Sequence, residues 1–331
     1  MFDISHFGFQ IFDFTSHVYR FTFDDSRLTI HDLFLLNLHT IMQKNIEVVL
    51  QGSHPSMVGD GFRVINFFPN GNKPGRKISP FILLDYHPSF YYAPAEKPRG
   101  VGVHPHRGFE TVTLAFKGAV AHHDSYGGEG TIWEGDVQWM TAASGVLHKE
   151  YHEKNFARQG GYMQMLQLWV NLPAKNKMDE PHYQAIANAT MPKVAIGSNG
   201  IVEVIAGSFE GNNGPAKTYT PINIYRVYVN AGGTISFNFN QQHNTGFLVV
   251  KGNITVNDKT QAQENEFVLF NHSGTDIKVS ATEEAEFIVL DGEPLDEPVV
   301  QYGPFVMNTP DEIREAIIDF NSGKFGVLED E

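Results

Sequence analysis

The chain has 331 residues, a formal net charge of −14 and no cysteine. The lack of thiols excludes disulfides, thiolate metal sites and cysteine nucleophiles, so any metal must be held by histidine and carboxylate side chains. A strongly acidic chain is also poorly suited to gripping nucleic acid directly, which needs clustered lysine and arginine. No apolar run of about 18 residues predicts a membrane-spanning helix. The N-terminus lacks the basic and apolar regions of a secretory signal, so we expect a cytoplasmic protein.

The first 41 residues differ from the rest of the chain. They hold eight of the 26 phenylalanines and show no sustained period of two or 3.6 residues. We therefore interpret residues 1–41 as an extension of doubtful status, with Met42 as the natural start or with a weakly ordered addition before it. The alternative is an extra strand or helix packed on the body of the protein.

After Gly59 the chain consists of short apolar or alternating runs separated by glycine, asparagine and proline. Such closely spaced strands predict an all-β protein of antiparallel sandwiches or barrels. Strands are predicted at residues 45–49, 62–65, 81–84, 110–116, 119–122, 136–140, 163–170, 193–196, 202–206, 225–229, 234–239, 247–250, 266–270 and 286–290.

The strands fall into two groups of similar length on either side of a polar segment, residues 173–178, which is the candidate linker. The second group looks like a decayed copy of the first, because a strand followed by Lys-Gly occurs in both. We therefore predict an N-terminal β domain over residues 42–178 and a C-terminal one over residues 179–331.

One helix is predicted near the C-terminus. Thr309 is a suitable N-cap, Pro310 suits the first helical position, and Glu312 completes a capping box. Gly323 provides the stop. The apolar stripe predicts a packing face that clasps the β body; it consists of Ile313, Ala316, Ile317 and Phe320.

Four side chains form the candidate metal site. Side chains two residues apart on a strand point to the same face, so His104 and His106 share a face, as do His148 and Glu150. Three imidazoles and a carboxylate from two neighbouring strands would suit a divalent transition metal and leave positions open for a ligand.

The surrounding residues narrow this pattern. A His-x-His strand followed some forty residues later by a Gly-x-x-His strand is typical of cupin barrels, and several stretches resemble the pirin family of the cupin superfamily. The resemblance runs from about residue 42 to the end and is carried by residues 104–113 (HPHRGFETVT), 135–142 (GDVQWMTA), 145–150 (GVLHKE), 292–298 (GEPLDEP) and 302–308 (YGPFVMN).

The resemblance implies a bicupin, that is, two cupin (double-stranded β-helix) barrels face to face with a C-terminal helix and one metal in the first barrel. Carried over to this chain, the implied ligands of a non-haem Fe²⁺ are His104, His106, His148 and Glu150. The same ligand set would accept Mn, Co, Ni or Cu. Many cupins take their carboxylate from the first motif, here Glu110, which the strand count also puts in phase with His104 and His106. We instead expect Glu110 to be a nearby supporting or structural carboxylate.

The remaining histidines are assigned other roles. We expect His122 and His123 to be solvated or structural residues at a turn, and His152 to be exposed or at the mouth of the site. In the second domain His243 lacks a His-x-His partner, so no metal is expected there. Aromatic and apolar residues would wall the first barrel, among them Phe109, Trp139 and Met140.

The resemblance implies a dioxygenase that opens the ring of a flavonol such as quercetin with O₂, with Glu150 as the catalytic residue that accepts the hydroxyl proton. The alternative is a metal-dependent regulatory protein, a transcriptional co-regulator or a modulator of a metabolic enzyme, with little turnover and a protein partner. A metal-free storage-type or sugar-binding cupin conflicts with the complete ligand set. We expect a monomer with no direct contact to nucleic acid or membrane.

Overall fold

The computed structural model describes residues 11–12, 18–19, 43–69 and 75–329. The chain forms two compact units, Met1–Ile41 and Met42–Glu331. In the first unit the described residues are an antiparallel pair, β1 (Ile11–Phe12) and β2 (Val18–Tyr19). The interpretation of residues 1–41 as an extension lies otherwise outside the described residues and stays a prediction.

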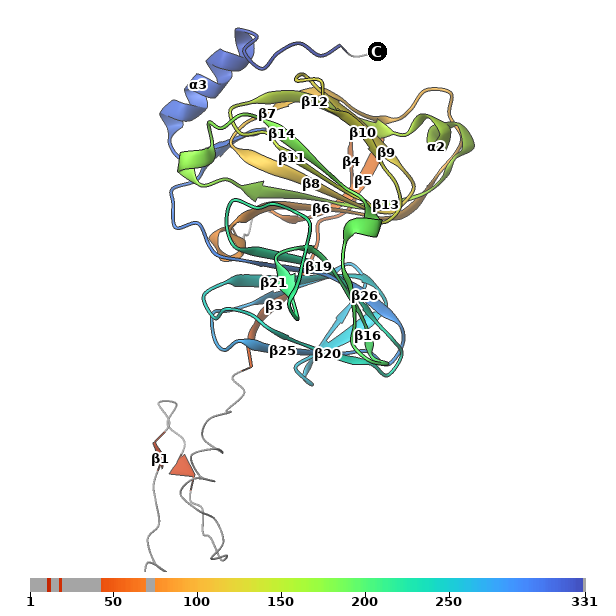
Figure 1. Cartoon of the computed structure of the whole chain (residues 1–331), viewed down its shortest axis with the longest axis vertical. Coiled ribbons are helices and arrows are strands. Elements are labelled where there is room, and N and C mark those ends of the chain that lie inside the picture. The colour runs from red at the N-terminus through yellow and green to blue at the C-terminus, as the bar shows by residue number, and fades with distance from the viewer. Residues whose placement is uncertain (1–10, 13–17, 20–42, 70–74, 330–331) are drawn as a thin grey trace, which may run out of the picture. The chain divides into compact units, whose positions relative to one another are not determined.

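The second unit is built from two barrels of the same design, each made of a seven-stranded and a four-stranded antiparallel sheet (Figure 1). In the first barrel the seven-stranded sheet has the order β14 (His182–Ile186), β11 (Val137–Thr141), β8 (Phe109–Lys117), β13 (Gly161–Asn171), β6 (Phe81–Tyr92), β5 (Phe62–Phe68), β4 (Ser56–Val58). Its four-stranded sheet has the order β10 (Glu129–Ile132), β9 (Val120–Asp124), β12 (Val146–His152), β7 (Gly100–His106).

The second barrel repeats this arrangement. Its seven-stranded sheet has the order β15 (Lys193–Ala195), β16 (Gly200–Ala206), β19 (Ile222–Val229), β26 (Ala285–Gly292), β21 (Asn244–Lys251), β24 (Glu266–Phe270), β3 (Ile46–Gln51). Its four-stranded sheet has the order β20 (Thr234–Asn238), β25 (Asp276–Ser280), β22 (Asn253–Val256), β23 (Thr260–Gln263). The predicted bicupin fold with two β-barrels is confirmed.

Short elements connect these sheets. They are two-stranded ribbons, 3-10 helices and one short α-helix: β17 (Ser208–Phe209) with β18 (Asn212–Asn213), β27 (Val300–Tyr302) with β28 (Phe305–Met307), η1 (Gly75–Ile78), η2 (Ala174–Asn176), η3 (Asn188–Thr190) and α2 (Lys154–Gln159). In the part of the chain that the structure describes, no helix is both long enough and apolar enough to cross a membrane.

The two seven-stranded sheets pack against each other through a shared apolar core. Leu114 and Leu168 of the first barrel belong to the same buried cluster as Leu248 and Ile288 of the second. Strand β8 is therefore buried along almost its whole length, because one face lines its own barrel and the other face meets this core. Its sequence alternates in residue type, yet both faces are covered.

The interiors of the two barrels differ. Phenylalanines and valines fill the second barrel between its two sheets, with Phe237, Phe247 and Phe287 in mutual ring contact. The interior of the first barrel has a smaller apolar cluster, which includes Val120 and Met163. The other end of the first barrel is lined by polar side chains, and the histidines lie there.

The predicted boundary between residues 178 and 179 puts each of three segments in one domain, whereas the segment packs against the barrel of the other domain. Strand β3, predicted within the first domain, pairs with β24 of the second barrel. Strand β14, predicted in the second domain, pairs with β11 of the first barrel. The C-terminal helix lies beside the first barrel, near β7 and β12 (Figure 1). The domain boundary stays a prediction. Each of these three segments belongs structurally with the barrel of the other predicted domain.

The candidate linker, residues 173–178, is firmly held. Lys177 is 1% exposed, and its ammonium donates hydrogen bonds to the carbonyl oxygens of Gly108 and Val306 and to Oδ1 of Asn171. Burial lowers the pKa of Lys177 to about 7, with Glu297 acting in the opposite direction. The segment is therefore a structural junction, because its lysine joins the first barrel to the chain that leads to the last helix.

The predicted C-terminal helix is confirmed as α3 (Pro310–Asn321). Thr309 accepts a hydrogen bond from the backbone N–H of Glu312, whose side chain returns to the N-cap backbone, so the capping box is complete. Ile313 and Ala316 are buried in a cluster with Phe305 and Phe325, whereas Phe320 is 38% exposed. The predicted stripe therefore packs mainly through Ile313 and Ala316, and Phe320 is partly exposed but still contacts the rings of Phe305 and Phe325.

A buried ion pair fastens this helix to the first barrel. Nη2 of Arg107 donates to Oδ2 of Asp319 over 2.9 Å, and both side chains are at most 7% exposed. Nε of Arg107 donates to the carbonyl oxygen of Ser144, and the guanidinium lies 4.7 Å from the ring centre of Phe325. Because Arg107 directly follows His106, the helix is fixed next to a candidate metal ligand.

Candidate metal centre

The three predicted histidines meet on two paired strands. His104 and His106 lie on β7, at the edge of the four-stranded sheet, and His148 lies on the neighbouring strand β12. In this antiparallel pair His148 is directly opposite His104, and Val146 is opposite His106. The potential ligand atoms of the three histidines lie within 4.8 Å of one another. The spacing of two residues on each strand therefore brings the three imidazoles into one cluster.

The hydrogen bonding of the three rings fits metal binding. Nδ1 of His106 and both ring nitrogens of His148 are buried without a hydrogen-bond partner among the described residues. Nδ1 of His104 donates to the carbonyl oxygen of Gly102 over 2.8 Å, which places the proton on Nδ1 and the lone pair on Nε2. Buried ring nitrogens without partners are costly unless a ligand such as a metal ion satisfies them.

The electrostatics of the cluster favour neutral rings. Burial lowers the pKa of both His106 and His148 well below the usual range, and the neighbouring histidines lower it further. Neutral imidazoles offer lone pairs, as a divalent transition metal requires. The residues present therefore fit a metal ion of the kind that the sequence predicts.

Glu150 lies beside the cluster but does not join it. Its carboxylate is buried on the same face of β12 as His148, yet the close group of ligand atoms contains the histidines alone. Oε1 of Glu150 is 3.4 Å from the hydroxyl of Thr113. Burial raises the pKa of Glu150 to about 7, against the opposing effect of the Thr113 hydrogen bond. Its assignment as fourth ligand stays a prediction.

Glu110 points away from the histidines. Its carboxylate accepts a hydrogen bond from Thr141 over 2.7 Å, on the face of β8 that meets the core between the barrels. The sequence count that put Glu110 in phase with His104 and His106 is wrong. The physical reason is that a turn at Gly108, with φ of +89°, separates β7 from β8, and the two strands belong to different sheets.

The aromatic wall of the site differs in part from the prediction. The ring of Phe109 lies 5.0 Å from that of His106, as a wall residue should. Trp139, by contrast, belongs to the core between the barrels. Its predicted place is taken by Trp169, which stacks on Phe109 at 4.2 Å and lies 5.2 Å from His106. The sequence shows that polar and apolar residues alternate along β13. It does not show which of the two sets of side chains faces the histidines.

Two other histidines are buried, contrary to expectation. His122 is 2% exposed on β9, directly opposite Glu150 on β12. His152 is fully buried, and its Nε2 bonds to the carbonyl oxygen of Gly61 over 2.8 Å. His123 lies nearer the surface and pairs with Glu129, as a solvated histidine would. Sequence reasoning therefore missed His122 as a residue of the barrel interior.

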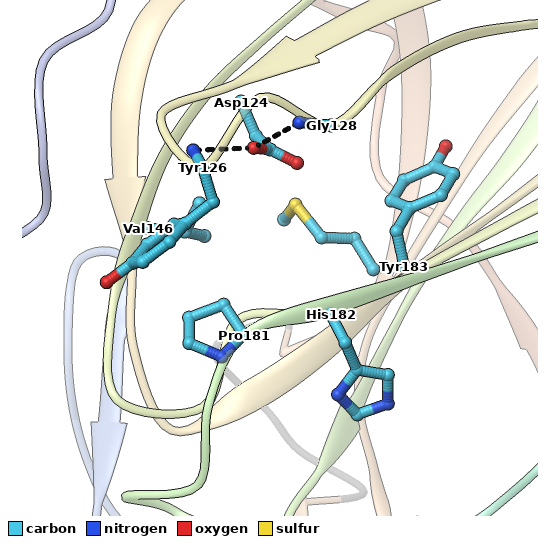
Figure 2. Close-up of a pocket in the computed structure, with 8 residues that line it drawn as sticks. Asp124, Tyr126, Gly128, Val146, Pro181, His182 and Tyr183 are labelled. Atoms are coloured by element: carbon cyan, nitrogen blue, oxygen red, sulfur yellow. Dashed lines mark hydrogen bonds between the residues drawn. The ribbon is translucent and has the colours of Figure 1, made fainter.

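A cavity of about 160 Å³ lies between residues of β9, β11, β12 and β14 (Figure 2). It is lined by Asp124, Tyr126, Gly128, Met140, Val146, Pro181, His182 and Tyr183. Asp124 is directly opposite His148, and Val146 is directly opposite His106. One carboxylate oxygen of Asp124 accepts hydrogen bonds from two backbone N–H groups of its own loop. Two of its lining residues thus pair directly with His148 and His106, although the three histidines are not themselves among the lining residues, and Met140 is.

Two family models match this chain. The model described as "Pirin" matches residues 61–170, and the model described as "Pirin C-terminal cupin domain" matches residues 224–326. A putative quercetin 2,3-dioxygenase of Pseudomonas aeruginosa is 45% identical over 269 residues, which is 81% of this chain and 93% of that protein.

Solved structures show the same likeness. A quercetin 2,3-dioxygenase from Acinetobacter baumannii has a TM-score of 0.83 and 44% identity, covering 86% of this chain and 99% of that one. The bacterial pirin YhhW from Escherichia coli, solved in complex with nickel(II), has a TM-score of 0.56 and 20% identity, covering 75% of this chain and 100% of that one. The second likeness concerns the fold alone.

Proposed function

The chain belongs to the pirin family, and from that premise we propose that it is a metal-dependent dioxygenase acting on enolic substrates of the flavonol type. The observation that carries the proposal is the cluster of three imidazoles, two of which burial keeps neutral. Two similar proteins bear the name quercetin 2,3-dioxygenase, one of them as a putative assignment. Quercetin is therefore the reference substrate.

We assign the metal to His104, His106 and His148, with Glu150 as the proposed fourth ligand. Fe²⁺ is the proposed ion, and Mn, Co, Ni and Cu suit the same nitrogen and oxygen donors. When bound, such an ion lowers the pKa of an enolic hydroxyl and offers open positions to substrate and O₂. The tautomer of His104, fixed by Gly102, orients one ligand before any metal arrives.

Glu150 is the proposed proton acceptor. A general base works best when its pKa lies near the working pH, and burial raises the pKa of Glu150 to about 7. Thr113 holds one carboxylate oxygen with a long contact of 3.4 Å, which leaves the group room to turn toward the cluster. Glu150 would take the hydroxyl proton as the substrate binds.

The aromatic residues around the cluster exclude water. Phe109 and Trp169 stack on each other, and both contact the ring of His106. Met140 and Val146 line the cavity. An apolar wall of this kind keeps solvent away from a reactive substrate anion while a few polar groups orient it.

The test is consumption of quercetin and O₂ by iron-loaded protein under air. The wild-type protein and His123→Ala, a matched change at a surface histidine, should remove the flavonol absorbance at similar rates. His106→Ala should lose activity together with bound iron. If wild-type protein and His106→Ala consume quercetin equally slowly, the enzymatic function is excluded.

A metal-dependent regulatory protein is the second candidate, and one observation favours it. The cavity of about 160 Å³ is smaller than the roughly 300–1,000 Å³ of usual ligand pockets. A cavity of this size would suit slow or incidental turnover. Metal-dependent binding to a protein partner, without O₂ uptake on any enolic compound, would support this candidate over the first.

A further inference from the structure

Beside the histidine cluster, the first barrel contains buried polar groups that no other described residue satisfies. They include Oγ1 of Thr111, Nε2 of His122, and both Oε1 and Nε2 of Gln138. All three residues are at most 2% exposed. A buried polar atom without a partner destabilises the folded state, so native proteins retain such atoms mainly where a ligand or ordered water satisfies them.

These groups surround Glu150 from both sheets of the barrel. His122 on β9 is directly opposite Glu150 on β12, so the two side chains share a face. Gln138 on β11 is directly opposite Thr113 on β8, whose hydroxyl reaches Glu150. Gln138 and His122 therefore lie deeper in the barrel than His148, one step along β12 from the histidine cluster.

The ring of His122 is held in a fixed position. It stacks on Tyr183 with 4.4 Å between ring centres, and its Nδ1 lies 3.1 Å from the Tyr183 hydroxyl. On its other side is Gly130, where a Cβ atom would lie 2.9 Å from Cε1 of His122. Because Nδ1 has a partner and the ring is clamped, Nε2 is the nitrogen that remains for a ligand.

The carboxamide of Gln138 has a specific chemical complement. It presents one hydrogen-bond donor and one acceptor in the same plane. A carbonyl with a neighbouring hydroxyl presents an acceptor and a donor with matching spacing. Quercetin has such a pair at the edge of its ring system, next to the enolic hydroxyl that we assign to the metal.

We propose that Gln138 and His122 form the polar subsite that binds the carbonyl and second hydroxyl of the substrate. The substrate is then an enolic compound with a further hydroxyl beside its carbonyl, inserted with its oxygen-bearing edge inward past the histidines. This inference rests on the proposed function, because it assigns the substrate class of the same site. Gln138 is a binding and positioning residue, and Glu150 keeps the proton-accepting role.

The experiment compares quercetin with its 5-deoxy analogue, which lacks the hydroxyl beside the carbonyl. Binding is measured by equilibrium titration of metal-loaded protein without O₂, so that turnover is not required. Wild-type protein should bind quercetin at least about tenfold more tightly than the analogue, since a site with buried polar groups rejects a ligand that leaves them unpaired. Gln138→Met should weaken quercetin binding at least about tenfold and remove the discrimination.

Matched variants separate recognition from folding. Gln164→Met changes another buried glutamine of the same barrel, one that bonds to the hydroxyl of Tyr86, and should keep the discrimination. Gln138→Met should match or exceed the wild-type melting temperature, because methionine needs no partner. If Gln138→Met does not fold, Gln138→Asn is the second variant. Asparagine keeps the amide group on a side chain one methylene shorter, so this variant should also lose the discrimination between quercetin and its analogue.

The outcomes distinguish this inference from the proposed function. If wild-type protein turns over quercetin and Gln138→Met keeps both affinity and discrimination, the subsite is overturned and buried water satisfies Gln138. If quercetin binds without turnover and Gln138→Met still weakens it, the subsite stands and the dioxygenase function falls. If wild-type protein does not bind quercetin at all, both fall.

Discussion

Replacing Glu110 with glutamine should stabilise the protein in a pH-dependent way. The carboxylate is 1% exposed, accepts one hydrogen bond from Thr141, and has no ion-pair partner among the described residues. Burial raises its pKa to about 7, against the opposing effect of Thr141. A buried carboxylate without a cation is a cost to the folded state whenever it is ionised.

The direction in which stability changes with pH follows from the protons that the folded and the unfolded chain bind at Glu110. The folded chain holds the Glu110 proton up to a pH of about 7, whereas an unfolded chain releases it near the ordinary value of 4.5. The protein is therefore most stable, as far as Glu110 is concerned, below a pH of about 4.5. Stability falls as pH rises to about 7 and is then constant. A difference of about 2.5 in pKa corresponds to about 3 kcal/mol.

Glu110→Gln should remove this cost, because the amide can still accept the hydrogen bond from Thr141. The free energy of unfolding in urea should exceed that of wild type by up to about 3 kcal/mol at pH 8, and by little at pH 4.5. Glu96→Gln, at an exposed position, should show no such difference. Bound metal should be unchanged, since Glu110 faces away from the histidines.

The reasoning would be refuted if Glu110→Gln lowered stability by more at pH 8 than at pH 4.5. That result would mean that the carboxylate has a stabilising partner when ionised. A loss of bound metal in this variant, with the fold intact, would restore Glu110 as a candidate ligand.

Three further predictions concern the attachment of the C-terminal segment to the first barrel and the proposed metal. Asp319→Ala should lower the free energy of unfolding by about 3 kcal/mol, because Arg107 would remain buried without its counter-charge. Gly145→Ala should cost about 1–3 kcal/mol, measured by urea unfolding, since φ is +128° and the new Cβ would lie 2.4 Å from the ring of Phe325. Chelation of the metal should lower the melting temperature of the wild-type protein. The loss should correspond to about 2.7 kcal/mol where the free metal concentration had been a hundred times its Kd. The melting temperature of His148→Ala should not change on chelation.

Each of these has a result that contradicts it. Unchanged stability of Asp319→Ala would mean that Arg107 finds water or another partner once the carboxylate is removed. A neutral Gly145→Ala would show that the ring of Phe325 can move aside. Equal melting shifts on chelation for wild type and His148→Ala would place the stabilising metal outside the histidine cluster.

The sequence by itself was sufficient to locate the three histidines. A strand puts every second side chain on one face, so His104 with His106 was a reliable pair, and the long match to the family pattern added His148. The capping box at Thr309 likewise predicted α3 from local chemistry alone. These features depend on residues within a few positions of one another, and local geometry constrains them.

The tertiary structure decided everything that depends on which elements meet. Glu110 was counted in phase with the histidines, but the turn at Gly108 moves the chain from one sheet to another and resets the face. Trp139 lies between the barrels, whereas Trp169 reaches His106. Periodicity states which residues share a face and leaves open what that face meets.

The sequence alone also could not predict which elements far apart in the chain pair with each other. Strand β3 crosses to the second barrel, β14 returns to the first, and Asp319 pairs with Arg107 from 212 positions away. The burial of His122 beside Glu150 depends on the pairing of β9 with β12. Side-chain spacing and the family pattern predicted the three histidines, while the pairing of distant strands determined which further polar groups surround them.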